Sequence, residues 1–127
     1  MRRRSFLAAA LAAALAAGCS NSRPLPMAAT PEKARPALEA ALAAWRDGKS
    51  PADLRAGSPP VFVNDPDFAR GRKLVDFKVA GDGKPFGTGL RYDVTLTVQD
   101  GSGPKAVRKV AYRVATDPTT SIFREDN

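Results

Sequence analysis

Residues 90–98 read Leu-Arg-Tyr-Asp-Val-Thr-Leu-Thr-Val, and apolar and polar side chains alternate at every position. Successive side chains of a β-strand point to opposite faces of a sheet, so this alternation predicts a strand with one buried face. The apolar face would carry positions 90, 92, 94, 96 and 98. The stretch decides the fold class, but it says nothing about chemistry.

A second strand follows the turn sequence Asp-Gly-Ser-Gly-Pro at residues 100–104. If the turn is centred on Ser102, every inward-facing pair is apolar on both strands, which supports this register. The predicted pairs are Leu90 with Val114, Tyr92 with Tyr112 and Val94 with Val110.

Two further strands flank this hairpin. Residues 75–79 alternate in the same way, and a glycine-rich loop at residues 81–89 leads from them into the central strand. Asp117-Pro118 is typical of a turn that returns the chain for a last strand. We expect Phe123 of that strand to join the core and Ile122 to point outward.

The region before the strands predicts helices. Leu38, Leu42 and Trp45 are spaced four and three residues apart, which is typical of one face of a helix. This helix starts either at Thr30-Pro31, with a kink at Pro36, or at Pro36 itself. Two short helices should follow Ser50 and Asp65, which are good N-terminal caps.

The order of elements therefore predicts an α+β domain of two layers, in which an N-terminal helix packs on a four-stranded antiparallel β-meander. This organisation resembles the cystatin-like and NTF2-like arrangement in element order alone. The resemblance implies a pocket between helix and sheet. Its candidate lining is aromatic, although four aromatic side chains at such positions also suit an ordinary core: Trp45, Phe77, Tyr92 and Tyr112.

The first residues indicate export. Three arginines at positions 2–4 precede twelve apolar residues at 6–17, too few for the about 20 that span a bilayer. This combination is typical of a secretory signal peptide. Residues 15–20, Leu-Ala-Ala-Gly-Cys-Ser, resemble the lipobox of bacterial lipoproteins, although Ala16 stands where leucine is commonest.

The resemblance implies cleavage between Gly18 and Cys19 and acylation of Cys19, including palmitate. The chain then divides into a signal peptide (1–18), a lipidated flexible tether (19–30) and a small α+β domain (31–127). Acyl chains would anchor the protein to a membrane. By analogy with lipoprotein sorting, Ser20 suggests the outer membrane, facing the periplasm. Residues 3–7 also resemble the twin-arginine pattern, so the export route stays open.

Composition excludes several kinds of site. The chain has no histidine and one cysteine, which excludes a histidine-based triad, a Cys/His zinc site and an intrachain disulfide. The net charge of +7 falls to +4 without the signal peptide, with 17 basic against 13 acidic residues. Asp65 and Asp67, with Asn64, could bind Ca²⁺, but helix capping explains them better.

Basic side chains gather on the polar face of the expected sheet: Lys78, Arg91, Lys109, Arg113 and, less clearly, Arg108. A solvated surface or an anionic envelope surface fits them. Nucleic acid does not, because we expect the aromatic residues, Phe123 included, on the core side.

We therefore expect no catalytic residue, no metal and no cofactor. The favoured interpretation is a lipid-anchored envelope protein with a non-catalytic binding or assembly domain, which contacts an envelope protein through a sheet edge and the glycine-rich loop. The alternative is a carrier of an apolar small molecule, or a histidine-free NTF2-like enzyme, using the pocket. The oligomeric state does not follow from the sequence.

Overall fold

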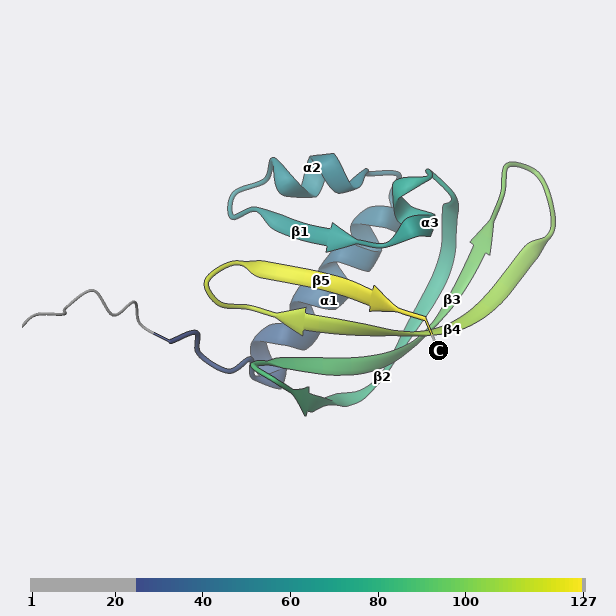
Figure 1. Ribbon diagram of the computed structural model, residues 1–127. Helices are drawn as coiled ribbons and strands as arrows, with labels where there is room; N and C mark the ends of the chain where they lie inside the picture. The colour runs from purple at the N-terminus through teal and green to yellow at the C-terminus, as the bar shows by residue number, and fades with distance from the viewer. Residues whose placement is uncertain (1–24, 127) are drawn as a thin grey trace, which may run out of the picture.

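The structure, a computed structural model, describes residues 25–126. It is an α+β fold in which helix α1 (Pro31–Arg46) lies across one face of a five-stranded mixed sheet (Figure 1). The strand order is β1-β5-β4-β3-β2. The predicted α+β class is confirmed.

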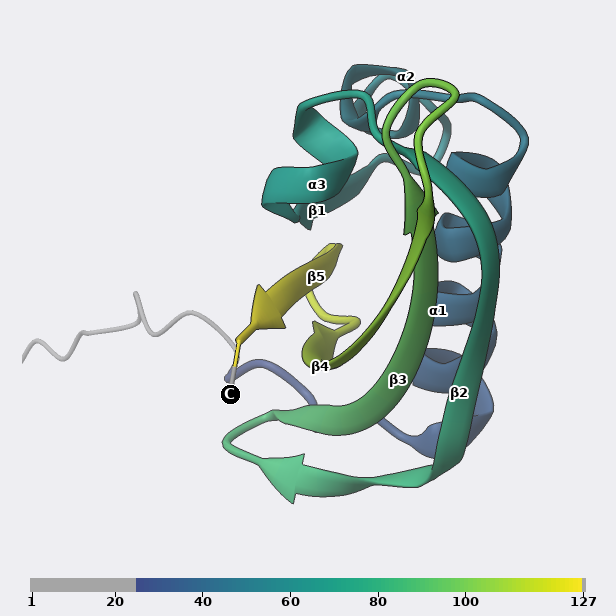
Figure 2. The ribbon, with the colours of Figure 1, turned by 90° about the vertical axis from the view of Figure 1, so that its right-hand side faces the viewer.

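Four consecutive strands form the predicted antiparallel part of the sheet. They are β2 (Lys73–Phe86), β3 (Gly89–Gln99), β4 (Lys105–Ala115) and β5 (Thr120–Glu125). Figure 2 shows that β2 and β3 bend along their length. Register shifts in β2 at Leu74/Asp76 and Ala80/Lys84 accompany this bend, as bulges bend the strands that contain them.

A fifth strand makes the four-stranded prediction incomplete. β1 (Val61–Asn64) pairs in parallel with β5, and Val63 lies opposite Ile122. The prediction of four strands did not include this segment. Its partner lies almost sixty residues later in the chain, so no turn or hairpin signal announces the pairing.

The predicted register of the central hairpin is confirmed at all three pairs: Leu90 with Val114, Tyr92 with Tyr112 and Val94 with Val110. These residues face α1, and both tyrosines are fully buried. The cross-strand apolar pairs thus form the centre of the core.

The last strand is oriented differently from the expectation. Val114 pairs with Ile122, so Ile122 is buried in the core and Phe123 is 46% exposed on the opposite face. The prediction that Phe123 joins the core was wrong. Strand faces alternate with a period of two, so an error of one residue in the turn inverts every side chain.

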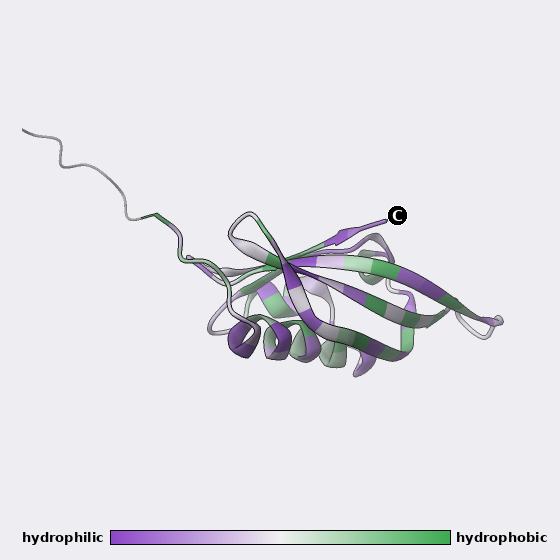
Figure 3. Ribbon diagram, turned by 90° about the horizontal axis from the view of Figure 1, so that it is seen from below, coloured by the Kyte–Doolittle hydropathy of each residue, from purple (hydrophilic) through white to green (hydrophobic). Residues whose placement is uncertain are grey.

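Helix α1 packs on the sheet through the predicted stripe, and it buries Ala34, Leu38, Ala41, Leu42 and Trp45. The helix begins at Pro31 and contains Pro36, so the earlier of the two expected starts is used. Trp45 stacks on Phe68 with ring centroids 4.9 Å apart, and its Nε1 donates to the Arg72 carbonyl oxygen at 2.7 Å. Figure 3 shows α1 on one side of the strands.

Two short helices follow the predicted caps. At α2 (Pro51–Arg55) the Ser50 hydroxyl accepts from the Asp53 N–H, and the Asp53 carboxylate accepts from the Ser50 N–H. At α3 (Pro66–Ala69) the Asp65 side chain caps the first turn. These helices carry the chain from α1 to β1 and from β1 to β2.

Replacing Leu38, which has no exposed surface, tests this packing. Leu38→Ala should lower the free energy of unfolding by about 2–5 kcal/mol, because it removes buried methyl groups and leaves a cavity. Urea denaturation measures the change, with exposed Lys33→Ala as the control on the same helix. Equal midpoints for the two variants would contradict the packing described here.

Candidate functional site

Two carboxylates are buried where α3 meets the sheet. Asp65 and Asp67 are 2% and 3% exposed, although charged side chains are rarely buried without partners. Their partners come from the segment between α3 and β2, from β4 and from β5. We call the whole set the buried ion cluster: Asp65, Asp67, Arg72, Arg108, Tyr112 and Arg124.

Asp65 uses both carboxylate oxygens. Its Oδ1 accepts the backbone N–H groups of Asp67 at 2.9 Å and Phe68 at 3.3 Å, together with Arg124 Nη1 at 3.0 Å. Its Oδ2 accepts the Tyr112 hydroxyl. Burial and the Asp65 charge raise the pKa of Tyr112, so Tyr112 stays protonated and acts as the donor.

Asp67 is surrounded by three guanidinium groups. Its Oδ2 lies 2.5 Å from Arg124 Nη1 and 3.4 Å from Arg108 Nη1, and its Oδ1 lies 3.0 Å from Arg72 Nη1. Burial acts to raise the pKa of Asp67, but the Arg124 hydrogen bond and the three positive charges outweigh it and lower the pKa. Asp67 is therefore ionised at neutral pH.

The buried ion cluster has a structural role, because it joins the start of α3 to β5. The carboxylates that could have bound Ca²⁺ accept hydrogen bonds from arginine, tyrosine and backbone N–H groups, which agrees with the capping interpretation. Within residues 25–126, no group of three or more His, Cys, Asp or Glu side chains could hold a metal ion. The sequence predicted Asp65 as a cap but did not indicate its partner Arg124.

The four residues of the candidate pocket lie in the core. Tyr92 and Tyr112 have no exposed surface, Phe77 packs partly buried beside them, and Trp45 is 3% exposed. Trp45 borders a cavity of about 410 Å³ near the end of α1. Its lining combines the Trp45 and Phe68 rings with four basic residues: Arg46, Lys49, Arg72 and Lys73.

The face of the sheet opposite α1, here called the outer face, exposes large apolar side chains. They come from β1, β2, β4 and β5: Phe62 (41% exposed), Phe86 (48%), Val107 (68%) and Phe123 (46%). Sequence reasoning missed Phe62 and Phe86. The alternation Val-Phe-Val at residues 61–63 was the available signal, because it places Phe62 opposite the two valines.

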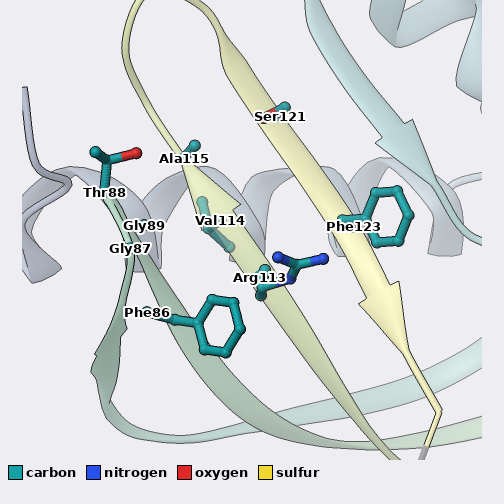
Figure 4. Close-up of a pocket in the computed structure, with 9 residues that line it drawn as sticks. All are labelled: Phe86, Gly87, Thr88, Gly89, Arg113, Val114, Ala115, Ser121 and Phe123. Carbon is teal, nitrogen blue, oxygen red and sulfur yellow. The ribbon is translucent and has the colours of Figure 1, made fainter. Parts of the chain in front are cut away.

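Arg113 lies between two of these rings (Figure 4). Its guanidinium carbon is 4.9 Å from the centroid of Phe86 and 5.3 Å from that of Phe123, both within the range of cation–π attraction. The three side chains border a cavity of about 380 Å³, together with the hairpin residues 87–89 and Ser121. Arginine and aromatic residues are enriched at the centres of protein interfaces.

The positive charge on the outer face is partly neutralised. Glu125 Oε1 lies 2.5 Å from Arg113 Nε, and Glu125 Oε2 lies 3.3 Å from Arg91 Nε. Lys78 and Lys109 occupy outer-face positions, as predicted. Arg108 does not, because it pairs with Leu96 on the inner face and reaches Asp67.

The placement of Phe123 also corrects the argument made from aromatic residues. We expected the basic face to lack aromatic side chains, whereas Phe123 and Phe86 flank Arg113. Phe123 lies on the outer face because the register of β5 differs by one residue from the expected one. The outer face is thus mixed aromatic and charged, and two of its arginines share one carboxylate.

Other parts of the chain lie against both edges of the sheet. On edge strand β2, the Arg35 guanidinium donates to the carbonyl oxygens of Val79, at 3.2 Å, and Gly81. β2 also contains Pro85 and three lysines, which discourage pairing with another strand. On the other edge, α2 lies beside β1 (Figure 1).

The chain enters the domain at one end of the sheet. The Ala29 N–H donates to the Thr88 carbonyl oxygen at 2.7 Å, and the Met27 N–H donates to Asp117 Oδ2 at 2.8 Å. These two residues, assigned to the tether, therefore contact the folded domain. The predicted cleavage and lipidation site at Gly18 and Cys19 lies outside the described residues.

No protein family, curated protein or solved structure matches this chain. Within the described part of the chain, no helix is both long and apolar enough to cross a membrane.

Arg124→Met tests the buried ion cluster. The variant keeps much of the side-chain volume but leaves Asp65 and Asp67 buried without their shared cation, so the free energy of unfolding should fall by about 3–5 kcal/mol. Urea denaturation measures the loss. Arg113→Met removes a partly exposed ion pair, so it should lower the free energy of unfolding by about 1 kcal/mol or less. A similar loss in the two variants would contradict the structural role of the buried ion cluster.

Acid should weaken the same cluster. The pKa of Asp67 is lowered on folding from its ordinary value of 3.8, so the unfolded chain binds the proton more readily. The stabilisation is complete well above pH 3.8 and is lost as the pH falls through the lower folded pKa. The urea midpoint should drop across this range, and Asp67→Asn should flatten the drop. An equally steep drop in Asp67→Asn would exclude Asp67 as its source.

Proposed function

We propose that this chain is a lipid-anchored cell-envelope protein whose domain binds an envelope protein and catalyses no reaction. The outer face carries the proposal, because Phe62, Phe86 and Phe123 are exposed together on a sheet face that α1 leaves uncovered. Exposed apolar surface of this kind marks interaction sites. Arg113 supplies a charged group at the centre of the same surface.

The anchor is argued from the sequence. Residues 15–20 resemble a lipobox, and the short apolar run before them suits a signal peptide. Acylated Cys19 would then tether the domain to a membrane, and Ser20 favours the outer membrane with the domain in the periplasm. A tether between anchor and domain suits a protein that holds a partner at the membrane surface.

The contact surface that we propose differs from the sheet edge expected from sequence. Arg35 engages two carbonyl groups of β2, and α2 lies beside β1, so both edges are partly covered against strand addition. A partner would therefore contact the outer face and the hairpin residues 87–89 that border it.

We propose a non-catalytic domain because of the side chains that the chain has and lacks. The chain lacks histidine, and its two buried carboxylates are held by arginines. The finer likeness to the cystatin-like or NTF2-like arrangement rests on a helix that crosses an antiparallel sheet. The alternative, a carrier or NTF2-like enzyme with an apolar pocket, is less favoured because the aromatic candidates pack as core.

Photo-crosslinking in cells tests the proposal. Phe123→p-benzoylphenylalanine keeps an aromatic side chain on the outer face and should give one discrete adduct with an envelope protein. Lys33→p-benzoylphenylalanine, on exposed α1, is the matched control and should give none. Arg113→Ala should reduce the adduct about tenfold or more, as central arginines of interfaces commonly do.

The anchor is tested in the same cells. Cys19→Ser should release the protein from the membrane fraction and remove the adduct. Absence of any protein adduct at Phe123, in a folded and acylated protein, would contradict a protein-binding outer face.

A further inference from the structure

We propose that the end of the sheet where the chain enters the domain rests on the bilayer that holds acylated Cys19. The occupant of this surface is a lipid bilayer, contacted by apolar side chains rather than by charge. This inference rests on the proposed lipidation, but it adds a second contact to the protein-binding outer face.

The entry end is fixed by hydrogen bonds. The Met27 N–H donates to Asp117 in the turn between β4 and β5, and the Ala29 N–H donates to Thr88 in the hairpin between β2 and β3. The incoming chain is thus held against both connections at this end of the sheet. The opposite end carries the hairpin between β3 and β4, around Ser102 (Figure 1).

The distance along the chain to the anchor is short. Five residues lie between Cys19 and Leu25, so the two positions are six residue steps apart, which is about 20 Å even when fully extended. Strand β3, with 11 residues, is about 35 Å long. The entry end therefore stays close to the bilayer in every orientation, whereas the Ser102 hairpin can point away from it.

The side chains at the entry end suit a membrane interface. Leu25 is 87% exposed and Met27 is 72% exposed, and Phe86 adds a ring that is 48% exposed. Short apolar groups with a neighbouring aromatic ring favour the boundary between headgroups and acyl chains. Arg113 packs its guanidinium against Phe86 and can keep its charge at headgroup level.

Charge at this end is balanced. Three basic residues, Lys84, Arg91 and Arg113, are offset by Asp82, Asp117 and Glu125, and Glu125 pairs directly with both arginines. Attraction to anionic lipid is therefore weak, and the contact should form on zwitterionic bilayers and persist in salt. Since Phe86 belongs to both surfaces, the outer face would stand next to the membrane, where an anchored partner can reach it.

Fluorescence quenching tests this orientation. The acylated mature protein is reconstituted into phosphatidylcholine vesicles with one new cysteine, because acylation blocks Cys19 and the chain has no other thiol. Thr88→Cys and Ser102→Cys, both at exposed positions, receive the same environment-sensitive nitrobenzoxadiazole label. The label at 88 should shift to the blue and be quenched by lipids spin-labelled near the headgroup, and the label at 102 should not.

A matched pair of variants identifies the contact. Leu25→Ser combined with Met27→Ser should remove most of the quenching at position 88. Val107→Ser, which removes an equally exposed side chain nearer the other end of the outer face, should leave it unchanged. Added phosphatidylglycerol and about 0.5 M salt should change the quenching little.

Three results would overturn the inference. Equal quenching at positions 88 and 102 means that the entry end does not face the bilayer. Quenching that needs anionic lipid and vanishes in salt means a basic contact instead. Protection at 88 only when an envelope protein is added means a protein contact. Mass spectrometry of Cys19 keeps the two proposals separate, since an acylated protein without quenching contradicts only the bilayer contact.

Discussion

The interaction of Arg124 with Asp65 and Asp67 is the constraint on which the arrangement of this fold depends. Arg124 lies next to the end of the last strand, and the two aspartates lie at the start of α3, almost sixty residues earlier. Their contact fixes the end of β1 beside β5 and so completes the fifth strand of the sheet. Removing the Arg124 guanidinium would leave two buried carboxylates without the cation that they share, which is strongly destabilising. The cluster therefore ties the first half of the domain to its last strand.

The parts of the fold that the sequence predicted are those with local signals. Alternation over residues 90–98 and the turn at residues 100–104 determine the register of β3 and β4, since one slip would expose the whole apolar face. The caps at Ser50 and Asp65 are equally local, because each cap bonds to groups within three residues. The parallel pairing of β1 with β5 was not predictable in this way. The three apolar residues at 61–63 favour a strand, but they do not identify a pairing partner far along the chain.

The residues of the candidate site also differ in whether a local sequence pattern predicted their positions. Arg113, Arg91, Lys78 and Lys109 were placed on the outer face because their strands had a clear period. Phe123 was placed on the wrong face because the short last strand, Thr-Ser-Ile-Phe-Arg-Glu, offers two apolar neighbours and no alternation to choose between them. Arg124 next to Phe123 decides the question, since its Nη1 binds the two buried carboxylates on the inner side. Long-range ion pairing, which has no sequence period, thus sets which aromatic ring reaches the surface.

The exposed surface of the domain follows from which edges and faces of the sheet the rest of the chain covers. Arg35 engages two carbonyl groups on one edge of the sheet, and α2 lies beside the other edge. The inner face is filled by α1 and the buried ion cluster. What remains is one face with aromatic side chains around an arginine whose charge is shared with Glu125. Contact with such a face removes apolar rings from water while breaking few hydrogen bonds.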